Sequence, residues 1–535
     1  MTVEALLIGV DGATFTVLDP LMARGVMPFL AELTARGTRA PLRTVMPPLT
    51  PPGWTSMMTG KRPGQHGVFD FFQKESVDSE YFRFTNSQDI QAATIWSLAS
   101  DYDKSVIALN FPLMFPPPAV KGCIVPGGWM PWRQLRLGCH PDGLFDRLKT
   151  LPSFNPRELS LDMTLEAKAI EGCPEEEYAD WIELHIRREE RWFEIASYLM
   201  REEPAELVGV MFDGVDKLQH LCWRFVDPAC QPLDPSPWEA RITALCERYF
   251  RRLDEIIAEL VAMAGPDALT VVGSDHGFGP TFDVFYLNSW LAQQGYLAWA
   301  DEASGGISVE AQIGFTQMTR HISDLDWKKT LAYVATPSSS GIHIVAQDPA
   351  GGPLPTETRA RITDELAAAL AEVRRPDNGK LLVSEIHTRV DAFAGPFEQY
   401  APDISVIFDG GTAVSILRSE ELIRGRPLAQ GGHRWEGVFV ASGPAVRRGA
   451  AIDEVSITDV APLLLYALDL PVPDDMSGVI PAAVFEDGQM ARRPARSVTT
   501  AAAAPIPMGE DGAVLFDDED EATILSRLRA LGYVE

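Results

Sequence analysis

The sequence predicts an α/β protein with a mostly parallel central sheet and helices on both faces. Short runs rich in Val, Ile and Leu end in Gly, Asp or Asn, as buried parallel strands do where they lead into loops. Helical stretches separate these runs, and this alternation is typical of a sheet that helices cover on both faces. The 535 residues are too many for one simple core, so two domains, or one domain with large insertions, are expected.

The individual elements follow from these patterns. Six runs are expected to form strands: residues 4–12 (EALLIGVDG), 105–112 (SVIALNFP), 206–214 (ELVGVMFDG), 268–277 (ALTVVGSDHG), 404–411 (ISVIFDGG) and 437–444 (GVFVASGP). Helices are expected at Tyr178–Arg201 and Trp238–Ala264. Polar residues just past the carboxyl ends of parallel strands gather at one edge of a sheet, where ligands bind. Four residues hold such positions: Asp11, Asp213, Asp275 and His276.

The chain is expected to divide into core segments and insertions. The core is predicted at residues 1–111, 205–279 and 401–490. Insertion or cap elements are predicted at 112–204, with helices, and at 280–400, because both regions contain stretches of much Pro, Gly and mixed polarity. Residues 491–535 are expected to form a linker and a C-terminal helix that serves packing, with leucines at helical spacing after a run of acids.

The composition argues against several classes of protein. There are 46 Lys and Arg against 75 Asp and Glu, and the formal charge of -29 disfavours a nucleic-acid polymer as partner. No membrane span and no secretory signal are expected, since no stretch reaches 18 uninterrupted apolar residues and no basic region precedes the N-terminal apolar run. A cytoplasmic location is therefore the default expectation. The six cysteines show no CxxC pairing, so a zinc knuckle is not expected.

Taken singly, most of the polar candidates have a structural explanation. Asp11 can cap the helix after its strand, and Asp216 and His220, four residues apart on one helix face, are more often a surface pair than a chelate. Asp275 and His276 are harder to dismiss, because they stand on a sharp turn between a buried strand and glycines. His433 is likewise flanked by glycines just before a strand.

As a set, these residues indicate a metal site. They comprise three carboxylates and three imidazoles: Asp11, Asp216, His220, Asp275, His276 and His433. Mixed Asp and His ligation without cysteine suits Zn²⁺ or Mn²⁺. A pair of such ions fits a phosphoryl site better than a structural zinc does.

The motifs resemble the alkaline phosphatase superfamily, and most closely its type I phosphodiesterase and nucleotide pyrophosphatase branch. The resemblance rests on segments that occur in the family's order: IGVDG, LTPPGWTSMMTGKRPGQHG, the D-x-x-x-H of Asp216 and His220, SDHG, and the GGH of His433. It implies a three-layer alkaline-phosphatase-like sandwich with cap-like insertions. It also implies a phosphoric ester hydrolase.

Carried over residue by residue, the resemblance implies two divalent ions. One would be held by Asp11, Thr50, Asp275 and His276, and the other by Asp216, His220 and His433. Thr50 would be the catalytic nucleophile, its alkoxide made accessible by metal coordination. We expect the flanking prolines to aim its hydroxyl at a metal, and the following helix, which ends at Gly60, to direct its first N–H groups at the bound phosphate.

The sequence departs from the family pattern at Gly53. Nucleotide pyrophosphatases carry an Asn three residues after the nucleophile, where it helps to bind a phosphoryl oxygen, and this chain has Gly53 there. Either a backbone N–H or another side chain substitutes, or the substrate differs. Asn110 is a candidate substitute, with a turn-forming role as the alternative. His343, in the strand-like run SSSGIHIV, is a further candidate substrate contact, and His66 is expected to hold the loop after the helix.

The predicted function is that of a metal-dependent phosphohydrolase, in the first place a phosphodiesterase that resembles nucleotide pyrophosphatases and acts on a small-molecule phosphoester. A phosphomonoesterase is an alternative, because diester selectivity depends on the shape of the pocket. A phosphotransferase like phosphoglycerate mutase is another, although that family uses Ser and this chain has Thr50. A non-catalytic metal-binding protein is the third. The sulfatase motif C/S-x-P-x-R is not matched by TPPGW. The natural substrate, the metal and the oligomeric state are left open.

Overall fold

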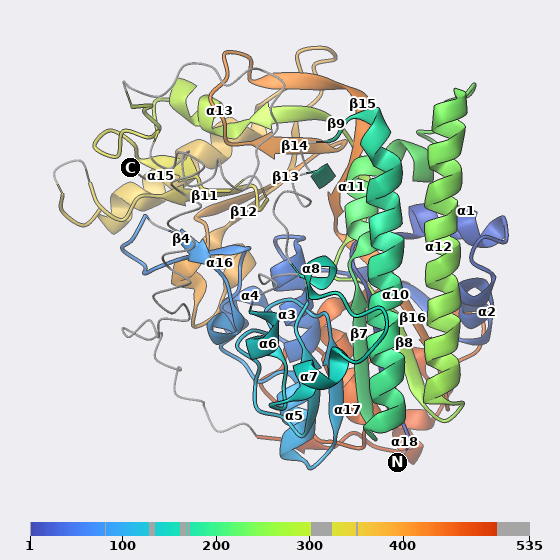
Figure 1. Cartoon of the computed structure of the whole chain (residues 1–535). Coiled ribbons are helices and arrows are strands. Elements are labelled where there is room, and N and C mark those ends of the chain that lie inside the picture. The colour runs from blue at the N-terminus through green and yellow to red at the C-terminus, as the bar shows by residue number, and fades with distance from the viewer. Residues whose placement is uncertain are drawn as a thin grey trace. The chain divides into compact units, whose positions relative to one another are not determined.

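Figure 1 shows the computed structural model of the chain, which describes residues 2–80, 82–127, 134–160, 168–169, 172–300, 324–336, 338–348 and 351–499. The chain up to Thr499 forms one unit. The C-terminal helix and nearly all of the linker predicted within 491–535 lie outside the described residues. No described helix has both the length and the apolar character needed to cross a membrane.

A nine-stranded sheet lies at the centre of the fold, and all its strands except β16 run in one direction. The strand order is β17-β2-β16-β8-β1-β7-β5-β6, and β18 also pairs with β2. The strands are β1 (Ala5–Val10), β2 (Thr38–Arg43), β5 (Val106–Leu109), β6 (Gly122–Val125), β7 (Leu207–Phe212), β8 (Leu269–Gly273), β16 (Glu436–Ser442), β17 (Ala450–Ala451) and β18 (Val455–Ser456).

Most of the predicted strands lie in this sheet, with two differences. The first four runs form β1, β5, β7 and β8, which are parallel, so the prediction of a mostly parallel sheet is confirmed. The run at 437–444 forms β16, which is antiparallel to β8 because it returns along the sheet. The run at 404–411 forms β13 (Ile404–Phe408), which pairs with strands outside the central sheet. Its placement in the core was wrong, since a short apolar run does not tell one buried sheet from another.

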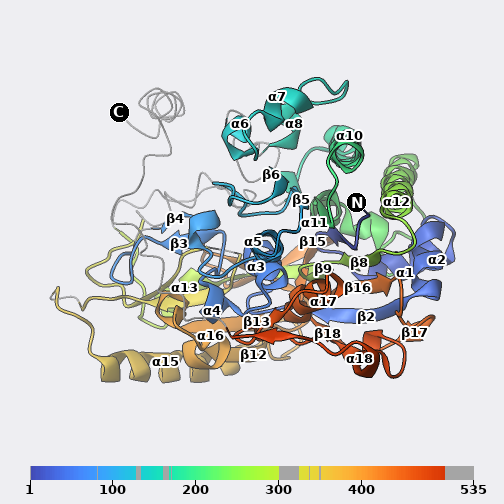
Figure 2. The ribbon, with the colours of Figure 1, turned by 90° about the horizontal axis from the view of Figure 1, so that it is seen from below.

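Helices cover both faces of the central sheet. Successive side chains of a strand point to opposite faces, and in β1 Leu6 and Ile8 enter one core while Ala5 and Leu7 enter the other. The first face packs against α1 (Phe15–Ala23), α2 (Pro28–Arg36), α10 (Tyr178–Glu202), α11 (Gly214–Val226) and α12 (Pro237–Ala264). The second packs against α3 (Thr50–Thr59), α5 (Ile95–Asp101) and α17 (Val460–Ala467). The fold is thus a three-layer α/β sandwich, and Figure 2 shows α10 and α12 nearly end-on, together on one side of the strands.

Both predicted long helices are present, and one of them begins and ends at clear local signals. α12 begins with a capping box in which Ser236 accepts from the Glu239 backbone N–H while the Glu239 side chain accepts from the Ser236 N–H, with Pro237 in the first turn. It ends before Gly265. α10 carries a buried face that includes Trp181, Ile182 and Trp192 and packs against α12. Both predicted helices are therefore confirmed.

An accessory lobe, which we define as residues 277–434, is inserted between β8 and β16. β9 (Gly277–Tyr286) leads into it and β15 (Ile423–Arg434) leads back, and the two pair antiparallel with β14 (Thr412–Ser415) beside β9. A four-stranded sheet follows the order β10 (Ala332–Val334), β11 (Gly341–Ile344), β13, β12 (Val383–Thr388). The described helices of the lobe are α13 (Leu287–Gln293), α15 (Thr356–Ala371) and α16 (Arg389–Phe393); Figure 1 shows α13 and α15 at the upper left and α16 below them. The lobe has a hydrophobic core of its own.

Shorter elements complete the fold: β3 (Phe72–Lys74), α4 (Pro63–His66), β4 (Phe82–Phe84), α6 (Leu135–Gly138), α7 (Leu144–Leu148), α8 (Pro156–Leu159), β19 (Val472–Pro473), α18 (Gln489–Arg492) and β20 (Ser497–Val498). β6, a strand of the central sheet, lies within the predicted insertion at 112–204. β13, a strand of the lobe, lies within the predicted core segment that begins at residue 401. The limits of the insertions stay a prediction.

Candidate active site

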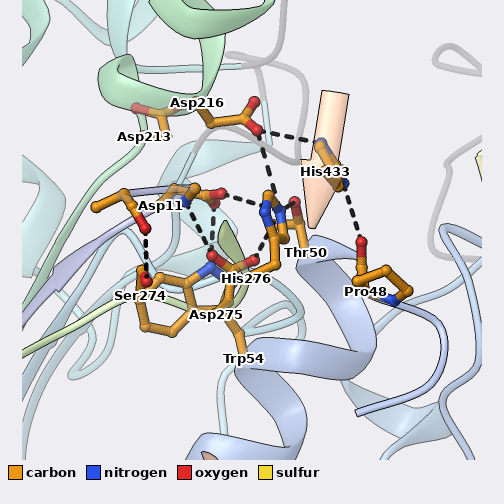
Figure 3. Close-up of polar contacts among 12 residues, drawn as sticks. Asp11, Pro48, Thr50, Trp54, Asp213, Asp216, Ser274, Asp275, His276 and His433 are labelled. Carbon is orange, nitrogen blue, oxygen red and sulfur yellow. Dashed lines mark hydrogen bonds and ion pairs between the residues drawn. The ribbon is translucent and has the colours of Figure 1, made fainter. Parts of the chain in front are cut away.

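The predicted ligands and nucleophile converge where the parallel strands end (Figure 3). Asp11 follows β1, and Asp275 and His276 follow β8. Asp216 and His220 lie on α11, which begins directly after β7. Thr50 is the first residue of α3. The carboxyl ends of neighbouring parallel strands thus collect side chains that are far apart in the sequence.

The accessory lobe supplies the remaining predicted metal ligand, His433. In the antiparallel pair of β9 and β15, His433 lies opposite Phe278, two residues after His276. The rings of His276 and His433 stack with centroids 3.8 Å apart. The same pair of strands that connects the lobe to the core therefore closes the site.

One group of donor atoms surrounds Asp216. Its Oδ1 lies 3.3 Å from His433 Nε2, 3.5 Å from His220 Nε2 and 4.0 Å from His276 Nε2. The Nε2 atoms of His220 and His433 are 3.0 Å apart. Among the described residues, this Asp216 oxygen is buried and has no hydrogen-bond partner.

A second group surrounds His276, whose Nε2 lies 3.2 Å from Asp275 Oδ2, 3.6 Å from Asp11 Oδ1 and 3.4 Å from the Thr50 hydroxyl. Each of these carboxylates is held through its other oxygen. The Gly12 N–H donates to Asp275 Oδ1 at 3.1 Å, and the Trp54 indole N–H donates to Asp11 Oδ2 at 3.0 Å. Asp11 Oδ1 and Asp275 Oδ2 are left without a hydrogen-bond partner in the described part of the chain.

The histidines are oriented with their lone pairs toward these oxygens. His276 Nδ1 lies 3.0 Å from the Gly277 carbonyl oxygen, and His433 Nδ1 lies 3.1 Å from that of Pro48. A carbonyl oxygen can only accept, so each Nδ1 carries the proton and each Nε2 is an acceptor. Acceptors that face carboxylate oxygens at such distances repel one another unless a cation lies between them. Backbone partners of this kind are typical of histidines that bind metals.

The pKa values point the same way. Burial raises the pKa of Asp11 well above its usual value, and the charges of Asp275 and Asp216 raise it further; burial likewise raises the pKa of Asp275. Burial lowers the pKa of His276 well below its usual value and that of His220 to about 4. These two imidazoles are therefore neutral near pH 7 and do not neutralise the Asp11 and Asp275 carboxylates, whereas a divalent cation would.

The residues present thus fit divalent cations. Within the described ranges, two sets of donor atoms are close enough together to hold an ion: Asp11, Asp275 and His276 form one, and Asp216, His276 and His433 form the other. Because His276 belongs to both sets, the division of ligands between two ions stays a prediction.

Thr50 stands at the start of α3 as predicted, but the helix offers fewer donors than expected. Leu49 is extended, and Pro51 and Pro52 fill the first turn. Prolines have no N–H, and the Gly53 N–H donates to the Leu49 carbonyl at 2.9 Å. The Thr50 N–H is therefore the first-turn donor left for a ligand, where several were expected. The helix ends at Gly60, whose φ of 67° allows the left-handed C-cap, as predicted.

None of the three predicted substrate contacts lines the pocket at the ligand cluster. Gly53 packs against the Asp275 backbone. Asn110 has φ 63° at the end of β5 and donates from Nδ2 to the Met211 carbonyl at 2.8 Å, so the turn-forming role holds. His343 is buried in the accessory lobe against Tyr333, where it faces a small separate pocket.

The close packing of Gly53 makes a testable prediction about the missing Asn. A Cβ at this position would lie 2.8 Å from the Asp275 carbonyl oxygen, which is backbone and cannot move alone. We expect Gly53→Asn to lower the free energy of unfolding by about 1–3 kcal/mol, the usual cost of overpacking. Thermal denaturation checks this against Gly425→Ala, where a Cβ meets open space. Equal stability of the two variants would contradict it.

His66 holds the loop after α3, as expected. The Val68 N–H donates to His66 Nδ1 at 3.2 Å, so Nε2 carries the proton and donates to the Ser56 hydroxyl at 2.9 Å. Burial lowers the pKa of His66 to about 3, so it stays neutral at physiological pH. It takes no part in the ligand cluster.

A pocket of about 330 Å³ opens onto the ligand cluster. Asp11, Thr50, Asp216, His220 and His433 line it, while Asp275 and His276 are fully buried. Much of its remaining wall comes from apolar residues of the accessory lobe and of the chain around the start of β3, among them Phe71, Phe72, Ile407, Phe408 and Val414. Residues from outside the central sheet therefore cover the site.

Three basic residues line this pocket and are not among the residues expected from the sequence: Lys217, Arg426 and Arg434. Lys217 is 7% exposed, and its ammonium lies 3.7 Å from an Asp213 oxygen that Arg188 of α10 also contacts at 3.1 Å. The sequence does contain a signal for Lys217, because this residue directly follows the predicted ligand Asp216. The sequence contains no such signal for Arg426, because its position in the pocket depends on how the accessory lobe folds.

A three-layer α/β sandwich with clustered Asp and His side chains at the carboxyl edge of its sheet is the architecture of the alkaline phosphatase superfamily. A family model described as Type I phosphodiesterase / nucleotide pyrophosphatase matches residues 5–421, and the chain belongs to this family. It is accordingly a phosphoric ester hydrolase of a divalent-metal-dependent family. The match ends before His433, so the place of His433 in the site rests on the geometry above.

Solved structures share the fold at low sequence identity. Human ectonucleotide pyrophosphatase / phosphodiesterase 5 is 14% identical with a TM-score of 0.51, over 91% of this chain and 100% of that one. Phosphonoacetate hydrolase from Sinorhizobium meliloti 1021, in complex with phosphonoformate, is 16% identical with a TM-score of 0.51, over 88% and 95%. At such identities the likeness concerns the fold. A comparison with curated protein sequences found no match.

Proposed function

We propose that the protein hydrolyses a small phosphodiester, with Thr50 as the nucleophile and two divalent ions, Zn²⁺ or Mn²⁺, as cofactors. The observation that carries this is the Thr50 hydroxyl, which lies 3.4 Å from His276 Nε2 beside carboxylate oxygens that have no partner among the described residues. A hydroxyl in that position and at the wall of a pocket can reach both a cation and a substrate.

The ligands divide as the family pattern implies, with Asp11, Thr50, Asp275 and His276 for one ion and Asp216, His220 and His433 for the other. When bound, such ions supply Lewis-acid charge that favours the ionised form of a hydroxyl or water and offsets the charge of the phosphoryl group. The carbonyls of Gly277 and Pro48 keep His276 and His433 in the tautomer that binds metal.

In the first step the Thr50 oxygen attacks phosphorus and the bond from phosphorus to the leaving oxygen breaks, so that the phosphoryl group is esterified to Thr50. In the second step a water attacks the same phosphorus and the bond to the Thr50 oxygen breaks. The Thr50 N–H donates to a non-bridging oxygen throughout, in the role that several helix N–H groups were expected to share. The extended Leu49 and the two prolines hold the hydroxyl in place.

Lys217 is the side chain that takes the place of the missing Asn. It is buried, lines the pocket beside Asp216 and Thr50, and is held by Asp213, which Arg188 fixes in turn. A positive charge aimed at a non-bridging oxygen stabilises the charge that develops during phosphoryl transfer.

We expect Lys217→Met to lower kcat by about 10²-fold, the usual loss when one group that stabilises transition-state charge is removed. Lys149→Met, at the exposed residue directly after α7, is the matched control and is expected to keep wild-type turnover. Steady-state kinetics on bis-p-nitrophenyl phosphate measures both. An unchanged kcat in Lys217→Met would exclude this role.

A diester is favoured over a monoester by the size and lining of the pocket. A volume of about 330 Å³ with apolar walls leaves room for an organic group beyond the phosphoryl site. A cytoplasmic location and the absence of a nucleic-acid polymer as partner stay predictions.

The test is the turnover of bis-p-nitrophenyl phosphate and p-nitrophenyl phosphate by metal-stripped protein reconstituted with Zn²⁺ or Mn²⁺. We expect activity to return with the metal and kcat/KM to favour the diester. A preference for the monoester would reassign the protein to the phosphomonoesterases. Product isomerised without release of phosphate would indicate a phosphotransferase.

A further inference from the structure

The pocket contains a basic side chain apart from the ligand cluster, Arg426 of β15. The register between β15 and β9 shifts between Gly425 and Gln430, so Arg426 lies in an interruption of the strand ladder. Such bulges turn a side chain away from the position that a regular strand would give it. Here the side chain reaches the pocket, where Thr281 lies beside it.

Arg426 is largely buried yet has few partners. Its NH1 donates to the Thr281 hydroxyl at 2.6 Å, and its buried Nε has no hydrogen-bond partner among the residues that the structure describes. No carboxylate in the described ranges forms an ion pair with it, and burial lowers its pKa to about 10, which still leaves it charged at neutral pH. A buried charge without a counter-ion is costly to the folded state, so a ligand that supplies the opposite charge is the expected reason for it.

The two other basic residues of the pocket differ in this respect. Arg434 donates to the carbonyls of Pro280 and His433, the latter at 2.8 Å, so its guanidinium serves the backbone. Lys217 lies beside the Asp213 carboxylate. Arg426 is therefore the pocket cation best placed to receive a second anion, apart from the reacting phosphoryl group.

The register of β9 and β15 gives the span between Arg426 and the ligand cluster. Gln430 lies opposite Thr281 and His433 lies opposite Phe278, three residues earlier in β9. At the rise of a strand these two positions are about 10 Å apart. The pocket also carries the apolar side chains Phe72, Ile407 and Phe408. The pocket thus combines a phosphoryl site, an apolar wall and a cation whose hydrogen-bond partner, Thr281, lies about 10 Å along the strand from the position opposite His433.

We propose that Arg426 binds a second oxyanion, carried by the organic group of the substrate and separated from the reacting phosphoryl group by an apolar spacer. The inference rests on the proposed function for the position of the reacting end. It narrows the substrate class to phosphoesters that end in a carboxylate or a further phosphate. Arg426 is then a specificity-determining residue.

Calorimetric titration of the metal-loaded protein with two phosphonates tests this. 6-Phosphonohexanoate carries a terminal carboxylate, and hexylphosphonate has the same chain without it. We expect the carboxylate compound to bind 10- to 100-fold more tightly, roughly the value of a charge-assisted hydrogen bond. The -29 charge of the chain would by itself disfavour the extra negative charge, so a preference requires a local cation.

Arg426→Met is expected to reduce this preference to less than twofold. Equal affinities in the wild-type protein, a preference that survives in Arg426→Met, or binding of neither phosphonate would overturn the proposal. Thr281→Val, which removes the hydrogen bond that orients Arg426 and keeps its charge, is expected to weaken the preference and serves if Arg426→Met fails to fold. Arg361→Met, on the exposed face of α15, is the matched control and is expected to keep the full preference.

The outcome of the phosphonate titration does not depend on whether the protein hydrolyses phosphoesters. Binding of a phosphonate requires no hydrolysis, so a protein that shows the preference but cleaves no phosphoester would refute the proposed function and leave the role of Arg426 standing. A protein that cleaves diesters but binds both phosphonates equally well would refute the role of Arg426 and leave the proposed function standing.

Discussion

Thr50→Ala is expected to lose turnover of phosphodiesters by on the order of 10⁴-fold or more, because removal of a covalent nucleophile leaves only binding and electrostatic contributions to catalysis. Its bound metal is expected to stay near the wild-type content, since Asp11, Asp275 and His276 remain. Steady-state kinetics on bis-p-nitrophenyl phosphate and metal analysis by mass spectrometry measure the two quantities on the same preparation.

The helix that carries Thr50 also offers the matched control. Thr55, one turn further along α3, is fully buried, and its hydroxyl has no partner among the described residues. Thr55→Val keeps the shape of the side chain and is expected to retain activity. Thr50→Ser restores a hydroxyl and is expected to recover part of the rate. Activity of Thr50→Ala within tenfold of wild type would exclude Thr50 as the nucleophile.

Asp216→Asn is expected to have the second largest effect. The Asp216 Oδ1 atom faces three imidazoles, and replacement of the carboxylate by an amide removes the negative charge of that group. We expect loss of one of two bound ions and a fall in kcat/KM on the order of 10³-fold, because a bound cation contributes several kcal/mol of charge stabilisation in the transition state.

Metal content and kinetics have to change together in this variant. Asp19→Asn, an exposed aspartate of α1 that pairs with Arg39, is the control and is expected to match wild type in both. Full metal content with lost activity would place Asp216 outside the ligand set. Full activity with one ion lost would show that the second ion is dispensable.

The central sheet and much of the site could be predicted because both follow from local patterns. Apolar runs mark buried strands, and parallel strands end at one edge, so Asp11, Asp275 and His276 were placed together by their position after β1 and β8. Asp216 and His220 follow the same rule through the helix after β7. The run that forms β13 has the same apolar pattern but lies in the accessory lobe, so this pattern alone does not assign a strand to the central sheet.

The parts that could not be predicted depend on long-range packing. Arg426 reaches the pocket only because β15 pairs with β9 and the ladder is interrupted beside it. Gly53 looked like a missing phosphate contact in the sequence, whereas the structure shows that it lets α3 approach the Asp275 backbone. The prolines after Thr50 remove N–H groups that a generic helix start would present. Each of these features depends on residues that are neighbours in space but distant in the chain, and a single sequence does not show which residues these are.

Anomalous diffraction at the Zn and Mn absorption edges, from crystals of the reconstituted protein, tests the account most directly. We expect two ions in the pocket beside Thr50, one held by Asp11, Asp275 and His276 and the other by Asp216, His220 and His433. A single ion, or ions bound elsewhere on the chain, would contradict a two-ion phosphodiesterase built on these residues.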